Sequence, residues 1–286
     1  MSEQNQQRPE PVELGRLSQW RDTAGLSDAK AREQAARLEL RARAEDEVAV
    51  RDEYVRLLGV APGERVLDVG CGSGAVTRTL AQRVAPGGCA VGVDMSPALL
   101  KVARELADEA GLGELVELKE GDCRALPFPD GSFDAVLAAT TLAHVPDAGR
   151  ALAEMVRVTR PGGRVGVFDF DGDSILISHP DREMTRRIVA AHSDHAAANS
   201  WLVRWLPGLL ADLGVANVRT RGFMPLESGG WHAYFAERAA EVAAEAGAIT
   251  SDERARWLEA LRAELAGKRF LGGRLHLFVW GTRPAV

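Results

Sequence analysis

Short apolar segments alternate with helical periods through the middle of the chain. Each segment is bounded by Gly, Pro or Asp, which is typical of buried strands. After the first of them, Val76, Leu80 and Val84 recur at every fourth position, the spacing of one helix face. Strands that alternate with helices of this length predict an α/β fold, in which helices cover both faces of a parallel sheet. The predicted strands are residues 65–69, 90–94, 116–120, 133–138 and 164–170.

The alternation weakens after residue 170. Residues 180–214 predict one or two helices, interrupted at Pro207-Gly208, and residues 215–223 predict a strand. Thr250 and Glu253 match the capping box that opens a helix. The chain closes on a predicted strand within residues 274–283. This region therefore adds helices to the sheet rather than repeating the earlier pattern.

The first part of the chain is helical in composition. Residues 27–58 are rich in Ala, Glu and Arg and contain no Pro. With 286 residues, 46% of them hydrophobic, the chain is long enough for one large domain with additions. We expect residues 1–58 to form a tail and covering helices, and residues 59–286 to form the domain.

Composition excludes several classes of protein. The longest run without a charged residue is 135–146, twelve residues, whereas a membrane helix needs about 20 apolar ones. The first residues carry no signal segment, so we expect a cytoplasmic protein. The three cysteines, Cys71, Cys89 and Cys123, are too widely spaced for a zinc cluster and are expected to be reduced thiols.

The charge pattern favours a small-molecule partner. Net charge is −6 and the basic residues are spread along the chain, so the footprint of a nucleic-acid binder is missing. Only four of the 35 basic residues are lysine, a usage typical of a GC-rich bacterial genome. The sequence leaves the oligomeric state open, a homodimer included.

A glycine-rich loop follows the first predicted strand. In "VLDVGCGSG", residues 66–74, glycines stand at alternate positions where an open parallel sheet binds its ligands. Glycine there lets backbone N–H groups approach a ligand closely. A dinucleotide fingerprint would place its third glycine at Ala75, but the third glycine is Gly74. Asp68 would also repel a pyrophosphate, and it suits an ammonium group.

Four motifs in order carry a resemblance to a known family. They are "VLDVGCGSG", "VGVDMSP" at 91–97, "GDCRALPFPDGSFDAV" at 121–136 and "MVRVTRPGGRV" at 155–165. The series resembles class I S-adenosylmethionine-dependent methyltransferases, with the ubiquinone/menaquinone-biosynthesis type the nearest. The resemblance implies a doubly wound, Rossmann-like sheet of seven mostly parallel strands, with the last strand antiparallel and a helical lid. It is close over residues 60–170 and holds only in outline beyond them.

The resemblance also implies how S-adenosylmethionine binds. Asp68 and the backbone at Gly70, Cys71 and Gly72 would hold its amino acid end, and Asp94 would accept hydrogen bonds from the ribose hydroxyls. Met95 would pack on the adenine. The remaining implied contacts are Asp122 with the adenine amino group, Cys123 and Arg124 beside the ring, and Thr140 beside the methionine part.

The reaction implied is methyl transfer to O, N or C of a small, neutral or hydrophobic metabolite. Such a transfer needs alignment and, for a hydroxyl or carbon acid, a base. The candidates are His144, in the loop after the fourth strand, and Asp169 and Asp171, which we expect at the same crevice after the fifth. The alternatives are a structural histidine bonded to the backbone at position 144 and, for at least one of the aspartates, a turn or cap residue. We expect no metal. Residues 171–270 would shape acceptor specificity.

Other side chains have structural and functional interpretations. His192 and His195 are three positions apart in a predicted helix, where a surface or lid role is expected. Trp201 and Trp205, four positions apart, are expected to pack in the core, with lining of a ligand pocket as the alternative. Arg51 and Tyr54 lie on the predicted lid.

Two rival functions remain open, and a third is disfavoured by the sequence. The same fold and cofactor can serve a cyclisation or rearrangement without methyl transfer, or a binding protein that acts through a partner. A nicotinamide-dependent oxidoreductase is disfavoured by Asp68 and by the glycine spacing.

Overall fold

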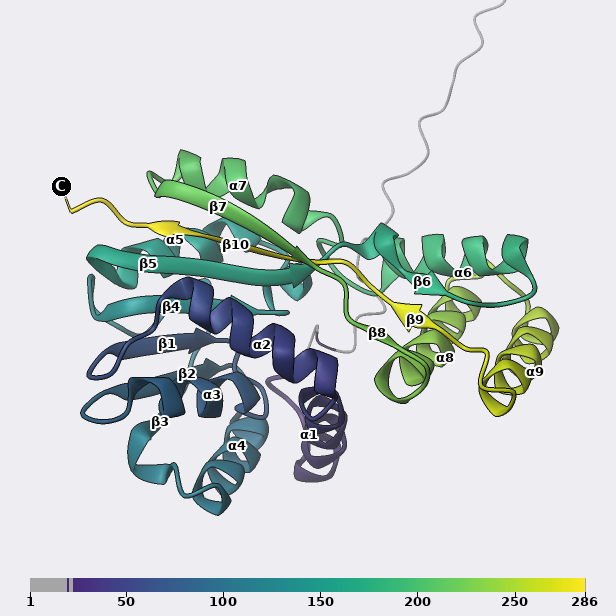
Figure 1. The fold of residues 1–286 in the computed structure, drawn as a ribbon, viewed down its shortest axis with the longest axis horizontal. Helices are drawn as coiled ribbons and strands as arrows, with labels where there is room; N and C mark the ends of the chain where they lie inside the picture. Colours follow the sequence, from purple (N-terminus) through teal and green to yellow (C-terminus); the bar gives the residue numbers. More distant parts are fainter. Residues whose placement is uncertain (1–19, 21–22, 286) are drawn as a thin grey trace, which may run out of the picture.

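A seven-stranded sheet runs through the centre of the protein (Figure 1). The computed structural model describes residues 20 and 23–285. The strand order is β3-β2-β1-β4-β5-β10-β7, and β10 runs antiparallel to both of its neighbours. The predicted seven-stranded sheet with an antiparallel last strand is confirmed. The strands are β1 (Arg65–Val69), β2 (Cys89–Asp94), β3 (Val116–Glu120), β4 (Phe133–Ala139), β5 (Thr159–Phe170), β7 (Ala216–Phe223) and β10 (His276–Thr282).

Helices pack on both faces of this sheet because its strands are apolar on both sides. Along β1, Val66 packs against α2 and α3, whereas Leu67 and Val69 pack with α5 and α7. This alternation follows from the period of two residues in a strand. The helices concerned are α2 (Glu45–Leu58), α3 (Ala75–Val84), α4 (Pro97–Glu109), α5 (Ala148–Val158) and α7 (Leu202–Asp212), with 3-10 turns η1 (Gly113–Leu115), η2 (Leu142–His144) and η3 (Gly172–Ser174).

A smaller lobe with its own core stands beside the carboxyl ends of the central strands (Figure 1). Its sheet has the order β6-β9-β8, and each strand is two residues long: β6 (Leu176–Ile177), β8 (Leu226–Glu227) and β9 (Gly272–Gly273). Three helices surround it: α6 (Arg182–His195), α8 (Gly230–Glu245) and α9 (Ser251–Ala266). The capping box of Thr250 and Glu253 is confirmed. The sequence did not predict α8, whose N-cap, Gly229, makes no side-chain capping bond.

Two expectations for residues 180–214 are wrong. The helices break at residues 196–201, and Pro207 lies inside α7. The helix continues through Pro207 because Leu206 and Leu210 are fully buried in the main core, which offsets one lost backbone bond. Trp201 and Trp205 are 46% and 61% exposed, not core residues. Each tryptophan directly precedes a leucine that is buried in the core. Since successive residues of a helix are rotated by about 100°, the tryptophan side chains point away from the core.

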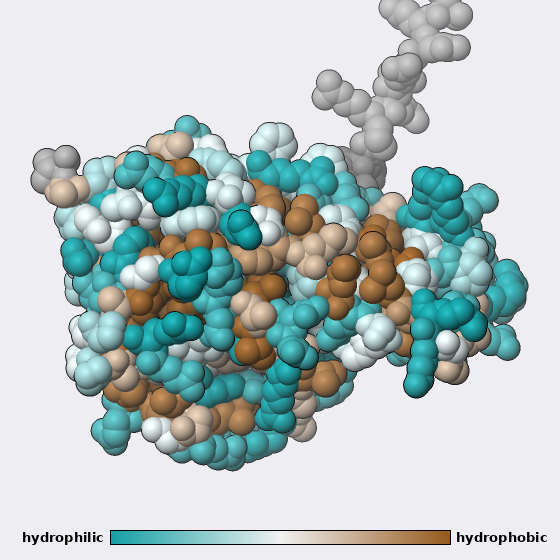
Figure 2. Space-filling view, in the orientation of Figure 1, coloured by the Kyte–Doolittle hydropathy of each residue, from teal (hydrophilic) through white to brown (hydrophobic). Residues whose placement is uncertain are grey.

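Apolar side chains also reach the surface around the small sheet (Figure 2). Met224, Leu226 and Leu271, next to or within β8 and β9, are each at least 40% exposed. Elsewhere on this face, charged and apolar residues are interspersed. No helix within the described residues is long and apolar enough to cross a membrane.

The α5 face of the sheet belongs to the main hydrophobic core, and Leu152 tests how much its packing stabilises the fold. Leu152 is fully buried in the main core. Replacing it with Ala should lower the free energy of unfolding by about 2–5 kcal/mol, because a cavity remains where the side chain packed. Equilibrium urea denaturation measures this. Leu40→Ala, at a position that is 52% exposed, is the control and should change it by less than about 0.5 kcal/mol. Equal losses in the two variants would contradict the packing described.

Candidate functional site

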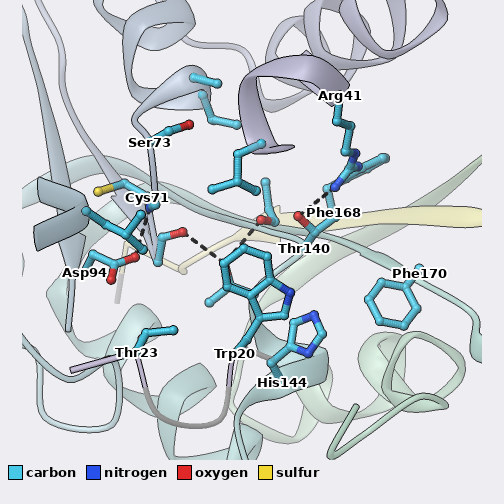
Figure 3. Close-up of a pocket in the computed structure, with 18 of the residues that line it drawn as sticks. Trp20, Thr23, Arg41, Cys71, Ser73, Asp94, Thr140, His144, Phe168 and Phe170 are labelled. Atoms are coloured by element: carbon cyan, nitrogen blue, oxygen red, sulfur yellow. Dashed lines mark hydrogen bonds between the residues drawn. The ribbon is translucent and has the colours of Figure 1, made fainter. Parts of the chain in front are cut away.

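One cavity of about 430 Å³ lies at the carboxyl ends of β1, β2, β4 and β5. Helices α2, α8 and α1 (Asp28–Ala42) contribute to its walls, together with Trp20 and Thr23 (Figure 3). Its volume falls within the range of small-molecule sites. All ten residues that the resemblance assigned to a cofactor line this cavity: Asp68, Gly70, Cys71, Gly72, Asp94, Met95, Asp122, Cys123, Arg124 and Thr140. His144 lines it too.

The glycine loop directs its N–H groups into the protein, not toward a ligand. The N–H groups of Gly70 and Cys71 both donate to the carbonyl oxygen of Val93, at 2.8 and 3.0 Å. The N–H of Gly72 donates to Asp94 Oδ2 at 2.9 Å. The expectation that these N–H groups approach a ligand is therefore wrong. A phosphate cradle needs such groups free, so this loop does not suit a pyrophosphate.

Glycine is required at the first position of the loop for two reasons. Gly70 has φ of +73°, in the left-handed region that glycine favours. A Cβ at this position would lie 2.3 Å from Cγ2 of Thr141, which follows β4. The loop can therefore pack against the end of the neighbouring strand only with a bare backbone.

Asp68 places a desolvated carboxylate beneath the loop. Its side chain is 1% exposed, and Oδ2 accepts a hydrogen bond from Thr77 Oγ1 at 2.6 Å. Burial raises the pKa of Asp68 to about 7, although the bond from Thr77 opposes the rise. A cation beside this group would compensate the lost hydration, because an opposite charge favours the ionised form.

Asp94 ends β2 with both carboxylate oxygens oriented by the backbone. Oδ2 accepts from the N–H of Gly72 and Oδ1 from the N–H of Ser96, each at 2.9 Å. Burial still raises the pKa of Asp94. Each oxygen retains a lone pair, so this carboxylate can accept two further hydrogen bonds from a ligand.

On the side of the cavity after β3, Asp122 and Arg124 pair with each other. The carboxylate of Asp122 accepts from the Arg124 backbone N–H at 2.8 Å and pairs with the Arg124 guanidinium at 2.7 Å. This pairing holds the pKa of Asp122 below its usual value. Cys123 stands between them, and burial raises the pKa of its thiol to about 12, so the thiol is neutral. Met95 lies at the rim and is 36% exposed.

Helices α1 and α2 close the cavity through a buried ion pair. Arg41, on α1, donates to Thr140 Oγ1 and pairs with Glu47 of α2, both at 3.1 Å. Tyr54 is buried and its ring stacks on Phe168 of β5, with 4.5 Å between centroids. Of the predicted lid residues, both Tyr54 and Arg51 line the cavity.

Aromatic rings and histidines form the far end of the cavity (Figure 3). The His144 ring centroid is 6.2 Å from that of Trp20 and 5.7 Å from that of Phe170. Burial, reinforced by the charges of Arg274 and Arg41, lowers the pKa of His144 to about 3. The imidazole is thus neutral near pH 7 and a weak proton acceptor.

Comparison with known proteins identifies the central part of the chain. Residues 67–167 match the family model described as a methyltransferase domain. A 37.1 kDa uncharacterized protein in a transposon of Streptomyces fradiae is 36% identical over 233 residues, 79% of this chain and 65% of that protein. A demethylmenaquinone methyltransferase of Listeria welshimeri is 43% identical over 119 residues, 42% of this chain and 50% of that enzyme. The central segment is therefore similar to methyltransferase domains.

The chain therefore spans only about half to two thirds of these relatives' own lengths. The crystal structure of a putative sarcosine dimethylglycine methyltransferase from Galdieria sulphuraria shares the fold, with a TM-score of 0.52 and 18% identity. That match covers 84% of this chain and 87% of the other. The Rossmann-like methyltransferase fold expected from the motifs is confirmed.

Two residues predicted as catalytic lie away from the cavity wall of the methyltransferase domain. Asp169 is fully buried, and its oxygens accept from the N–H groups of Ala143 and Phe170 at 2.9 and 3.0 Å. Asp171 forms an ion pair with Arg204 at 2.6 Å. Neither is among the described residues that line the cavity, so the expectation that they face the crevice is wrong. The strand alternation and the η3 turn direct them into the protein.

Sequence reasoning missed much of the far end of the cavity. His192, from α6, lines the cavity and is buried, not on the surface. Further lining residues come from α8 and from the segment before β10: Trp231, Tyr234, Phe235, Arg238 and Arg274. All of these lie beyond the matched methyltransferase domain and belong to no local motif. Only the Ala-rich, aromatic composition of residues 230–245 could have suggested a buried helix there.

Because Gly70 lies so close to Thr141, we expect a side chain at this position to cost more stability than one at a glycine in open space. Gly70→Ala should destabilise the protein more than Gly63→Ala. Both residues have positive φ, but a Cβ at Gly63 meets nothing within 4 Å, whereas at Gly70 it meets Thr141. Strain alone should cost about 1–2 kcal/mol at each site, and the excess at Gly70 reports the contact. Chemical denaturation of the two variants measures this difference. Equal losses of unfolding free energy would show that Thr141 moves aside without cost and would contradict the close contact.

Proposed function

We propose that this protein transfers the methyl group of S-adenosylmethionine to an O, N or C atom of a small-molecule acceptor. The observation that carries the proposal is the arrangement of charged and backbone groups at the end of the cavity formed by β1 and β2. Two carboxylates, Asp68 and Asp94, stand there beside a glycine loop whose N–H groups are already bonded within the protein. This arrangement suits a ligand with an ammonium group and hydroxyls rather than one with phosphates.

Each polar group of the cofactor has a matching residue. Asp68 would pair with the ammonium group, and Asp94 would accept from the two ribose hydroxyls with its remaining lone pairs. Thr140, held by Arg41 at 3.1 Å, would border the methionine part. Asp122 would reach an adenine amino group as part of its ion pair with Arg124. Met95 and Cys123 would contact the ring.

Bound S-adenosylmethionine supplies a methyl group on a positively charged sulfur. The sulfur is the leaving group, and because it departs neutral it needs no proton. The chain has to align the acceptor and exclude water. The cover formed by α1, α2 and α8 provides the exclusion. His144 is at the right end of the cavity to take a proton from the acceptor, but its pKa of about 3 makes it a weak base. We therefore assign most of the rate to alignment.

The supporting segments follow from this proposal. Residues 1–58 would act as tail and lid; residues 1–19 and 21–22 lie outside the described structure. Residues 59–286 would form the catalytic unit, with 171–270 shaping the acceptor end. The bacterial relatives and the composition support a bacterial, cytoplasmic enzyme that acts on a small metabolite and has no nucleic-acid or membrane partner.

Asp68 makes cofactor binding depend on pH. Its pKa is about 7 in the folded protein and about 3.9 in an unfolded chain, so ionising it costs stability as pH rises through this window. An ammonium group favours the ionised form. The affinity for S-adenosylhomocysteine should therefore rise from pH 5.5 toward 7.5, by at most about tenfold per pH unit.

Asp68→Asn isolates this effect. It should weaken binding, flatten the pH dependence and make the unliganded protein more stable at pH 8. Calorimetric titration with S-adenosylhomocysteine and thermal melting measure these changes. A wild-type affinity that does not change with pH would contradict the pairing.

Asp94 provides the test of the cofactor and of turnover. Asp94→Asn should weaken the binding of S-adenosylhomocysteine by about 10- to 100-fold, because hydrogen bonds to a charged group are lost. Asp52→Asn, at an exposed ion pair with Arg83, is the matched control and should bind normally. NAD should not raise the melting temperature.

Methyl transfer itself is measured as S-adenosylhomocysteine formed together with methylated product, over a panel of small acceptors. Loss of this product in Asp94→Asn but not in Asp52→Asn is the expected result. Binding without S-adenosylhomocysteine formation by any acceptor would favour a cyclisation, a rearrangement or a binding role.

A further inference from the structure

Arg274 is a buried cation on the cavity wall. It lies between β9 and β10 and is 6% exposed. Its guanidinium carbon is 3.8 Å from the ring centroid of Phe170 and 4.9 Å from that of Phe235, and both rings also line the cavity. Within residues 20 and 23–285, no hydrogen-bond acceptor or carboxylate pairs with this guanidinium. An acceptor for its N–H donors can therefore come from a ligand in the cavity.

Nearby carboxylates are committed elsewhere. Glu47 pairs with Arg41, and the two oxygens of Asp169 accept backbone N–H groups. Burial, followed by repulsion from Arg41, lowers the pKa of Arg274 to about 9. A buried charge that lacks a partner is costly, and an anion bound beside it would offset that cost.

The positive charge of Arg274 also lowers the pKa values of the histidines around it. Besides burial, its charge lowers the pKa of His144 and of His192, both to about 3, and that of His276 well below the usual value. These imidazoles are neutral near pH 7 and do not add repulsion to an incoming anion. His192 Nδ1 is buried without a hydrogen-bond partner in the described part of the chain.

Arg274 is also remote from the cofactor end. Asp68 and Asp94 belong to β1 and β2, whereas Arg274 precedes β10, three strands from β1 in the order β1-β4-β5-β10. With neighbouring strands about 4.8 Å apart, the axes of β1 and β10 are about 14 Å apart. Arg274 therefore enters the cavity from the side away from Asp68 and Asp94, and the test below separates an acceptor anion from the cofactor's carboxylate.

Given the function proposed above, on which this step rests, we propose that Arg274 recognises an anionic oxygen, a carboxylate or an ionised acidic hydroxyl, on a planar aromatic acceptor. The guanidinium would pair with the oxygen, and the acceptor ring would lie among Phe170, Phe235 and the α8 aromatics Trp231 and Tyr234. This replaces the expectation of a neutral acceptor. Arg274 is then a residue that determines acceptor specificity.

A pair of probes that differ only in charge tests the assignment. We would titrate 2-naphthoate and 2-naphthamide into the full-length protein, with and without saturating S-adenosylhomocysteine, and measure both affinities by calorimetry. The variants are Arg274→Gln, which removes the charge, and Arg274→Lys, which keeps it. Arg83→Gln is the control for the loss of one positive charge, because Arg83 is an exposed partner of Asp52 and is not among the described residues that line the cavity.

The expected result is a preference for naphthoate in the wild type that Arg274→Gln reduces by about tenfold or more, since a charge-assisted hydrogen bond is lost. Arg274→Lys should retain part of it, and Arg83→Gln all of it. Naphthamide affinity and S-adenosylhomocysteine affinity should not change. If Arg274→Gln does not fold, as judged by thermal melting, the wild-type preference and its partial retention in Arg274→Lys decide the matter.

Three results would overturn the assignment. They are equal binding of the two probes in the wild type, a preference that survives in Arg274→Gln, and a loss of S-adenosylhomocysteine affinity in that variant as large as the loss for naphthoate. The last would assign Arg274 to the cofactor's carboxylate. The proposed function fails separately: if S-adenosylhomocysteine does not bind while the naphthoate preference still depends on Arg274, the anion site stands and the methyltransferase proposal falls.

Discussion

The cofactor end of the cavity depends on one backbone interaction, the double hydrogen bond that ties the turn after β1 to the end of β2. The carbonyl oxygen of Val93 accepts from the N–H groups of both Gly70 and Cys71. This fixes the path of the turn, and the next N–H, that of Gly72, then reaches Asp94. Asp68 and Asp94 are thereby held at adjacent strand ends, where one ligand can meet both.

The same interaction explains why the glycines are needed. Because the N–H groups of Gly70, Cys71 and Gly72 are bonded within the protein, the loop offers a ligand its shape and its carbonyl oxygens rather than these donors. Gly70 must approach Thr141 at the end of β4, and a Cβ would prevent this. The loop is therefore a spacer between three strand ends, and the carboxylates on either side of it supply the recognition.

Electrostatics divides the cavity into two ends. Buried carboxylates dominate at β1 and β2, whereas Arg274 and neutral histidines dominate beyond β5. Arg41, paired with Glu47 and bonded to Thr140, lies on the cover. Charges buried without full compensation cost stability, and they are retained where a ligand completes the pairing. A cationic ligand group suits the first end and an anionic one the second.

The sequence by itself determined the central sheet and the cofactor end. Strand and helix periods, and motifs in which Asp68, Gly70 and Asp94 lie within 27 residues, depend on local geometry that neighbouring residues enforce. Only the tertiary structure decided that the loop N–H groups point inward, that Asp169 and Asp171 face away from the cavity, and that Trp201 and Trp205 are exposed. It also brought α8 and Arg274 to the site from more than 150 residues beyond the loop. Such placement follows from packing between distant segments, which no local period or spacing records.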